Sequence, residues 1–266
     1  MGKERLEAGR GRGSGVVKNS GSRKQIPAAR PGDGRKRWFY VLLAVLLIGG
    51  IAGLSYMAAR PRGVSQLANT TPIPNQGHVL GSDSAAIEVV EFGDFECPAC
   101  GAFANLTEPD VRARLVNAGQ IRFRFIDYPL PMHRNTWAAH GAAWCAGEQG
   151  KFWEMHDVIF QNQDRWNGEV TRRPDGVLTN LARGVGLDMT RYEACVDARK
   201  YYPQIQANLN EAQRRGIPST PTFIIGNKQI SNNLSYDQFK RYVDEAIAAA
   251  RGGTGSAGTK AAPTSR

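Results

Sequence analysis

The chain has 266 residues and a net charge of +10, a length that suits one large domain or two small ones. All of the excess charge lies in residues 1–62, with 13 Lys or Arg and three acidic residues, whereas the remainder carries 21 of each sign. The composition therefore does not support a nucleic-acid-binding face on a folded domain. Four cysteines are too few for a disulfide scaffold, but they allow two bridges in an oxidising compartment.

Residues 1–37 are rich in Gly, Ser, Arg and Lys and are predicted to be disordered and cytoplasmic. Residues 38–57 carry no charge and, as a helix, would span roughly 30 Å, the thickness of the hydrocarbon core. Basic residues at 35–37 predict that the N-terminus stays cytoplasmic and that the rest of the chain lies outside. A cleaved signal peptide is the alternative. The long leader and long apolar run favour an uncleaved anchor.

Pro, Asn, Thr and Gly residues in 58–77 indicate a polar linker. Residues 78–81 then suggest a short edge strand, and the apolar run 86–92 a buried strand. The sequence Cys97-Pro98-Ala99-Cys100 follows at the start of a predicted helix. A Cys-x-x-Cys pair at a strand-to-helix junction is typical of redox chemistry.

Cys97 is predicted to lie at the helix start, where unpaired backbone N–H groups and the helix dipole favour a thiolate, the reactive form of cysteine. Pro98 loses no hydrogen bond in the first turn. Cys100, one turn later, is expected to be more buried and to act as the resolving thiol. A structural disulfide and half of a zinc site are the alternatives. Zinc usually requires a second close Cys/His pair, which this sequence lacks.

In residues 120–128, apolar and basic side chains alternate as in a strand, which completes a strand–helix–strand unit with parallel strands. The first helix is expected to be interrupted near Pro109. A block of predicted helices follows, at 136–146, 152–160, 177–185, 188–196 and 203–215.

Residues 222–226 and 229–230 then form a predicted hairpin. A last helix begins at Ser235, whose capping box is completed by Gln238. Residues 252–266 are predicted to be a disordered tail. This order of elements predicts an α/β thioredoxin-like fold with an inserted helical subdomain, preceded by a single transmembrane helix.

Four stretches between residues 78 and 250 together resemble the DsbA family of extracytoplasmic thiol:disulfide oxidoreductases. They are the Cys-Pro-Ala-Cys motif, the loop 219–223, Glu91 six residues before Cys97, and the stretch 145–156. The resemblance implies one domain over 78–251 with a helical insertion at about 133–215. It also implies that Pro221 is cis and faces the motif, and that Glu91 transfers protons at the buried cysteine.

The residues themselves are compatible with these roles. A cis bond before Pro221 would turn the backbone of Thr220 outward, where an extended substrate could pair with it. The alternative is an ordinary trans proline at a strand start. Glu91, on an apolar strand, should have a raised pKa from desolvation unless it points to solvent. Cys145 and Cys195 lie on apolar faces of different helices and are predicted to form a structural disulfide, with two free thiols as the alternative.

Asp94 and Glu96 would oppose a thiolate at Cys97 unless they face away from it. The four histidines, at positions 78, 133, 140 and 156, show no metal-binding spacing and are expected in surface or core roles. We therefore predict neither a metal nor a cofactor.

The sequence thus predicts a monomeric, membrane-anchored oxidase that acts outside the cytoplasmic membrane on unfolded or reduced secreted proteins. The resemblance implies reoxidation by a quinone-linked membrane protein, DsbB-like or VKOR-like. A reductase or isomerase of the same fold is the main alternative, because Pro98-Ala99 lacks the histidine of strongly oxidising relatives. A copper- or zinc-binding module and a non-catalytic domain with an inert disulfide are the others.

Overall fold

The computed structural model describes all residues except 1–33, 60–62, 68–73, 75 and 256–266, and the chain divides into two compact units at Arg60. In the first unit, α1 (Gly34–Ala59) contains a span, Lys36–Tyr56, that is long and apolar enough to cross a membrane. The side chains of this span are exposed, as those of a lipid-facing helix would be. The predicted anchor, residues 38–57, lies within α1.

The second unit contains a six-stranded sheet in the order β1-β6-β5-β3-β4-β2. The strands are β1 (Val64–Gln66), β2 (His78–Leu80), β3 (Ile87–Gly93), β4 (Ile121–Asp127), β5 (Thr222–Ile225) and β6 (Lys228–Ile230). Strands β3 and β4 are parallel, as the strand–helix–strand pattern predicted, whereas the other pairs are antiparallel. Of the two central strands, β3 leads into the Cys-x-x-Cys motif, and β5 begins directly after Pro221.

Strand β1 lies inside the stretch 58–77, which the sequence analysis treated wholly as a linker. It pairs with β6 along the sheet edge, with Val64 opposite Ile230. Backbone bonds from Ser231 N to Gly63 O and from Leu67 N to Asn227 O, both 2.8 Å, extend this pairing. The strand has only three residues, mostly exposed, so no alternation of apolar side chains marks it in the sequence.

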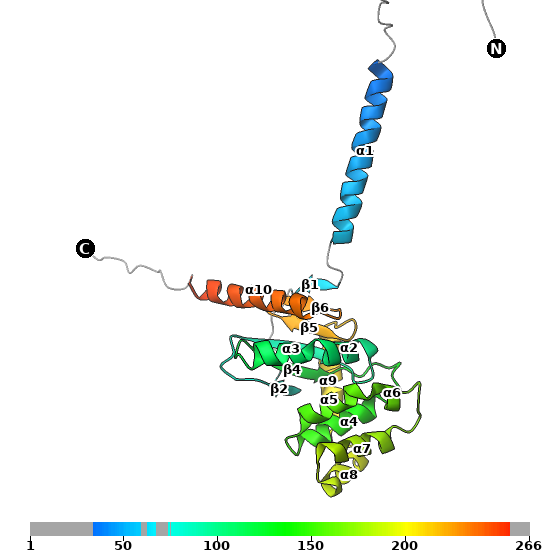
Figure 1. The fold of residues 1–266 in the computed structure, drawn as a ribbon, viewed down its shortest axis with the longest axis vertical. Coiled ribbons are helices and arrows are strands. Elements are labelled where there is room, and N and C mark those ends of the chain that lie inside the picture. Colours follow the sequence, from blue (N-terminus) through cyan, green and yellow to red (C-terminus); the bar gives the residue numbers. More distant parts are fainter. Residues whose placement is uncertain (1–33, 60–62, 68–73, 75, 256–266) are drawn as a thin grey trace, which may run out of the picture. The chain divides into compact units, whose positions relative to one another are not determined.

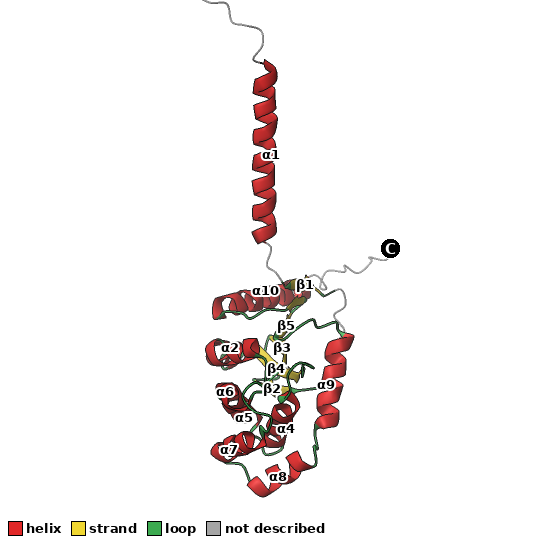
Figure 2. Cartoon of the chain, turned by 90° about the vertical axis from the view of Figure 1, so that its right-hand side faces the viewer, coloured by secondary structure: helices red, strands yellow, loops and turns green. Residues whose placement is uncertain are grey.

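Helices cover both faces of the sheet (Figure 1, Figure 2). On one face, α2 (Pro98–Leu106) and α10 (Tyr236–Gly255) pack through Phe103 and Phe239 onto Phe223 of β5. On the other, α9 (Tyr202–Arg214) contributes Ala212 to a smaller core with Val90, Phe92, Ile126, Ile217 and Ile224. Because successive strand residues alternate between faces, Glu91 lies on the same face as α2.

The helix after the motif is interrupted near Pro109, as expected, and continues as α3 (Glu108–Val111) and η1 (Arg112–Val116), a π-helical turn. The insertion contains α4 (Thr136–Gly147), α5 (Phe152–Gln161), α6 (Gln163–Trp166), α7 (Asp175–Val185) and α8 (Met189–Asp197), and ends with α9. The sequence analysis did not predict α6, which is a single turn of helix. At α10, the Ser235 and Gln238 side chains bond each other's backbone N–H, as in a capping box.

Candidate active site

Cys97 is the residue that precedes α2, and Pro98 is the first residue of that helix. The Cys97 backbone is extended (φ −71°, ψ 122°), its N–H donates to Asp94 O at 3.0 Å, and its carbonyl accepts from Gly101 N at 3.0 Å. The sulfur is thus held at the helix start, where free N–H groups favour an anion. Both Cys97 and Cys100 are free thiols in this structure.

The loop before β5 lies at the same end of the sheet as the end of β3 and reaches this sulfur too. The peptide bond between Thr220 and Pro221 is cis, and Cys97 Sγ donates to Thr220 O at 3.5 Å. The Thr220 hydroxyl is buried and has no hydrogen-bond partner among the described residues. The structure therefore brings together the motif and the proline loop, which are more than 100 residues apart in the chain.

The surroundings of Cys97 lower its thiol pKa from 9.0 to about 6. The main cause is a hydrogen bond from the Cys100 thiol, and the N–H groups of Cys100 and Ala99 add to it, whereas burial opposes it. At neutral pH most of the Cys97 sulfur is consequently thiolate. A thiolate that is 7% exposed is able to attack another protein's disulfide.

Cys100 differs from Cys97 in both exposure and acidity. It is fully buried, and burial raises its pKa well above 9.0, as do the hydrogen bond to Cys97 and the negative charges of Cys97 and Glu91. Glu91 is 1% exposed, so it does not point to solvent, and burial together with the negative charge of Glu108 raises its pKa well above 4.5. The arrangement pairs a reactive sulfur with a buried thiol and a buried carboxyl group, both of which have raised pKa values.

Asp94 and Glu96 lie close to Cys97 in sequence, but hydrogen bonds engage their carboxylates elsewhere. Asp94 accepts from the backbone N–H of Glu96 and Leu130, both at 2.8 Å, and from His133 Nδ1 at 2.7 Å. Glu96 accepts from the N–H groups of Asn135 at 2.7 Å and Gly168 at 2.6 Å. Despite burial, the bond from His133 and the charge of His140 lower the pKa of Asp94. These two acids therefore fasten the motif to the insertion.

Gln163, in α6, supports the loop that carries Cys97, and the sequence did not single it out. Its side-chain amide donates to Phe95 O at 2.6 Å and to Cys97 O at 3.0 Å. A side chain at Gly101 would collide with it, since a Cβ there would lie 2.3 Å from the amide oxygen of Gln163. The Gly after the motif is the one sequence signal of this close approach.

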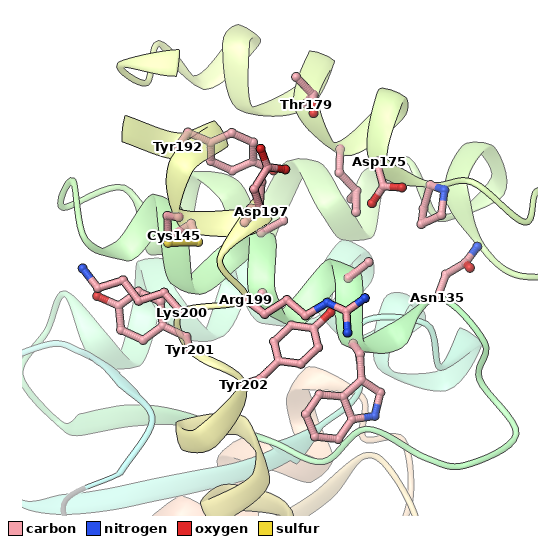
Figure 3. A pocket seen from close by; sticks show the side chains of 18 of the residues that line it. Asn135, Cys145, Asp175, Thr179, Tyr192, Asp197, Arg199, Lys200, Tyr201 and Tyr202 are labelled. Atoms are coloured by element: carbon pink, nitrogen blue, oxygen red, sulfur yellow. A yellow bond between two sulfur atoms is a disulfide. The ribbon is translucent and has the colours of Figure 1, made fainter. Parts of the chain in front are cut away.

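Cys145 of α4 and Cys195 of α8 form a disulfide. It borders a cavity of about 430 Å³ in the insertion, which is also lined by Tyr192 and Tyr202 (Figure 3). The guanidinium of Arg199 lies 5.5 Å from the centre of the Tyr202 ring. The cavity lining does not include Cys97 or Cys100, so the two pairs of cysteines occupy separate sites.

The histidines have structural partners in this structure. His140 Nδ1 lies 2.5 Å from Asp127 Oδ1, and the His78 ring stacks on Phe152 with 3.5 Å between ring centres. Burial lowers the pKa of His78 to about 4. Within the described ranges, no three His, Cys, Asp or Glu side chains are grouped to hold a metal ion.

Fold and site together define a thioredoxin-fold protein with a helical insertion and a Cys-x-x-Cys pair at a helix start. Residues 74–245 match the family model described as thioredoxin. The chain belongs to this family.

Three individual comparisons add to this result. The chain is 26% identical over 172 residues to disulfide bond formation protein D of Bacillus subtilis, covering 64% of this chain and 76% of that protein. It is 34% identical over 179 residues to the Na⁺/H⁺ antiporter NhaA 1 of Salinispora arenicola, covering 67% of this chain and 26% of the antiporter. The chain thus spans about a quarter of the antiporter's length. The crystal structure of oxidised BdbD from Bacillus subtilis superimposes with a TM-score of 0.60 at 24% identity, over 69% of this chain and 99% of that one.

Proposed function

We propose that this protein is a membrane-anchored thiol:disulfide oxidoreductase that oxidises cysteine pairs of unfolded, secreted proteins outside the cytoplasmic membrane. The observation that carries the proposal is the state of Cys97. Its sulfur lies at the start of α2, has a pKa of about 6, faces the Thr220 carbonyl and has a buried thiol partner in Cys100. The relative named disulfide bond formation protein D supports the same chemistry.

The reaction begins from the Cys97–Cys100 disulfide. A substrate thiolate attacks Cys97 Sγ, the bond to Cys100 breaks, and its electron pair leaves on Cys100, which takes a proton from Glu91. A second substrate thiolate then attacks the substrate sulfur of the mixed disulfide and releases Cys97 as thiolate. The substrate leaves with a disulfide and the enzyme is reduced by two electrons. The low pKa of Cys97 favours this direction because it stabilises the reduced form.

The turn at Thr220–Pro221 supports a role in holding substrate. The Thr220 carbonyl lies 3.5 Å from Cys97 Sγ, so a peptide that pairs with the backbone of this loop would present its sulfur to Cys97. Such pairing between the loop and an extended peptide uses backbone groups, so it requires no particular substrate sequence. Broad action on unfolded chains follows from backbone recognition.

The location and the redox partner complete the proposal. Helix α1 would anchor the protein in the membrane, with its basic flank cytoplasmic and the domain outside. A quinone-linked membrane protein, DsbB-like or VKOR-like, would then restore the disulfide of a monomeric enzyme. The antiporter name belongs to a protein of which the match covers 26%, and we do not extend its transport activity to this chain.

The test is the reduction potential of the Cys97–Cys100 pair in the full-length protein, solubilised in detergent and equilibrated with glutathione buffers. A potential above about −150 mV would establish a donor of disulfides, and one below about −250 mV a reductase. Failure to reach equilibrium with glutathione would show an inert disulfide. Zinc or copper co-purifying in stoichiometric amount with the reduced protein, measured by plasma spectrometry, would favour the metal-binding alternative.

A further inference from the structure

Behind the Cys-x-x-Cys motif lies a group of three buried polar atoms without hydrogen-bond partners among the described residues. They are Glu91 Oε2, Glu108 Oε2 and His156 Nε2. Each of these side chains is at most 1% exposed. Buried polar groups are normally satisfied, because leaving one without a partner costs about 1–3 kcal/mol. Three such atoms on titratable side chains therefore require a reason.

The three side chains surround one part of the core. Glu108 Oε2 lies 3.8 Å from His156 Nε2. Phe125 contacts the His156 ring edge-on, with 5.2 Å between ring centres, and is the partner of Glu91 in the pairing of β3 with β4. A Cβ at Gly93 would lie 2.4 Å from the Phe125 ring and 3.2 Å from Glu91 Oε1. The negative charge of Glu108 is, after burial, the largest cause of the raised pKa of Glu91.

The outer end of the group reaches solvent. Arg112 donates to Glu108 Oε1 at 2.8 Å and, through its other nitrogens, to both carboxylate oxygens of Asp157. The Asp157 side chain is 40% exposed. Arg112 and Asp157 line a surface cleft of about 350 Å³. The line of groups thus runs from Cys100 and Glu91 in the core to the surface between η1 and α5.

His156 is able to carry a proton on either nitrogen in this setting. Its Nδ1 lies 2.9 Å from Asp157 Oδ1, which only accepts, and 3.2 Å from Arg112 Nη2, which only donates. Donation to Asp157 leaves Nε2 free to take a proton from the side of Glu108, whereas acceptance from Arg112 leaves the proton on Nε2. The imidazole therefore has one proton position on the side of Asp157, at Nδ1, and one on the side of Glu108, at Nε2.

We propose that Glu108 and His156 form a proton relay between Glu91 and the solvent cleft at Arg112 and Asp157. The proposal rests on the oxidoreductase function above and assigns it two positioning residues. The gap of 3.8 Å between Glu108 and His156 is one that a water molecule or a small side-chain rotation bridges.

The relay replaces the proton that Glu91 gives to Cys100 during disulfide exchange. When the Cys97–Cys100 bond breaks, the Cys100 sulfur receives the electron pair and the proton of Glu91. Glu91 is then a second buried carboxylate beside Glu108, an unfavourable pair of like charges. A proton from solvent enters at the cleft, passes through His156 and Glu108, and restores neutral Glu91. During reoxidation the same groups first carry the Glu91 proton outward, and the Glu91 carboxylate then takes the proton of Cys100.

The groups that face the relay come from every element around it. Cys97 directly precedes α2 and Cys100 belongs to it, whereas Glu91 lies in β3, Glu108 in α3, Arg112 in η1, and His156 and Asp157 in α5. The charge of His156 also contributes to the lowered pKa of His78 in β2. The pH dependence of the relay is consequently that of the whole group.

The test uses the full-length, oxidised protein and follows its reduction by dithiothreitol by stopped-flow fluorescence over pH 5–9. We expect His156→Gln to slow reduction on the order of tenfold, less than the full effect of a positioned acid, and to enlarge the solvent deuterium isotope effect. Millimolar imidazole should restore the rate, because the cleft admits a small base. Asp157→Asn, at the exposed end of the relay, should change the pH profile in the same direction as His156→Gln. It carries less risk to folding.

Glu154→Gln is the matched control, since Glu154 is an exposed acid of α5 whose partner is Lys151, outside the relay. It should leave the rate and the pH profile unchanged. The proposal is overturned if folded His156→Gln reacts at the wild-type rate with the wild-type profile, or, should that variant not fold, if Asp157→Asn behaves like Glu154→Gln. If the wild-type protein itself does not react with dithiothreitol, the oxidoreductase function fails instead.

Discussion

The two cysteine pairs of this domain lie at opposite ends of helices, and this difference separates their chemistry. Cys97 precedes α2, where the free N–H groups of the first turn favour a negative sulfur. Cys145 and Cys195 lie in the last turns of α4 and α8, where the free carbonyl groups disfavour one. Exchange requires a thiolate, so the first pair is prepared for it and the second is protected from it.

The surroundings strengthen the contrast. The buried groups around Cys97 and Cys100 include charged and unpaired side chains such as Glu91. The Cys145–Cys195 bond lies in the same apolar cluster as the first pair, near Ala142, Leu178 and Tyr192, and has no buried unpaired acid among the described residues of its cavity. Buried unpaired groups destabilise the fold at the first pair, and the disulfide stabilises it at the second. This combination is typical of a reactive site on a rigid scaffold.

Replacement of cysteine by serine in the two pairs should give the largest difference. We expect Cys97→Ser to reduce thiol oxidation to the background rate, because it removes the nucleophile and leaves no disulfide to transfer. The double variant Cys145→Ser/Cys195→Ser should retain activity at temperatures where it is folded. The measurement is oxidation of a reduced model peptide under glutathione buffers. Full turnover by Cys97→Ser would refute the assignment of the first pair.

The same double variant should lose stability instead. Its bond joins residues 50 apart in sequence, for which the chain-entropy model gives about 4 kcal/mol. Urea denaturation of the wild-type protein and the double variant, monitored by circular dichroism, measures the difference. A loss below about 1 kcal/mol would contradict a structural role for this disulfide.

The pH dependence of alkylation tests the environment of Cys97 directly. In reduced wild-type protein, we expect the rate with iodoacetamide to rise with a midpoint near pH 6, because the thiol pKa is lowered to about 6. The fully buried Cys100 should react far more slowly, and Cys100→Ser identifies the sulfur that is modified. A midpoint close to pH 9 would show that the hydrogen bonds around Cys97 do not stabilise its thiolate.

Glu91→Gln should produce the smallest of these effects, on stability. The native pKa of Glu91 lies above its ordinary value of 4.5, so its protonated form supports folding at low pH and this support is lost as pH rises through the native pKa. The variant cannot ionise. Relative to wild type, it should therefore gain stability above about pH 4.5, by at most about 1.4 kcal/mol per pH unit. Urea midpoints measured from pH 4 to pH 8 test this sign, and a parallel pH dependence in both proteins would contradict it.

The local sequence predicted those features that depend on neighbouring residues. The position of Cys97 at a helix start, the parallel β3–β4 pair and the capping box at Ser235 each follow from a short pattern. Gln163, Glu108 and His156 approach the motif only through the packing of α5, α6 and α3. Strand β1 is an edge pairing through the backbone alone. No periodicity in a single chain records such contacts.

The contact between Gly101 and Gln163 ties the insertion to the motif it follows. The amide that orders the Cys97 loop comes from α6, more than 60 residues away, and fits only because position 101 lacks a side chain. A larger residue at 101 would displace Gln163, and loss of the insertion would remove this donor from the Phe95 carbonyl and leave the Cys97 carbonyl with Gly101 N–H. The motif and the helical subdomain are thus mutually dependent parts. In evolution or engineering they must be exchanged together.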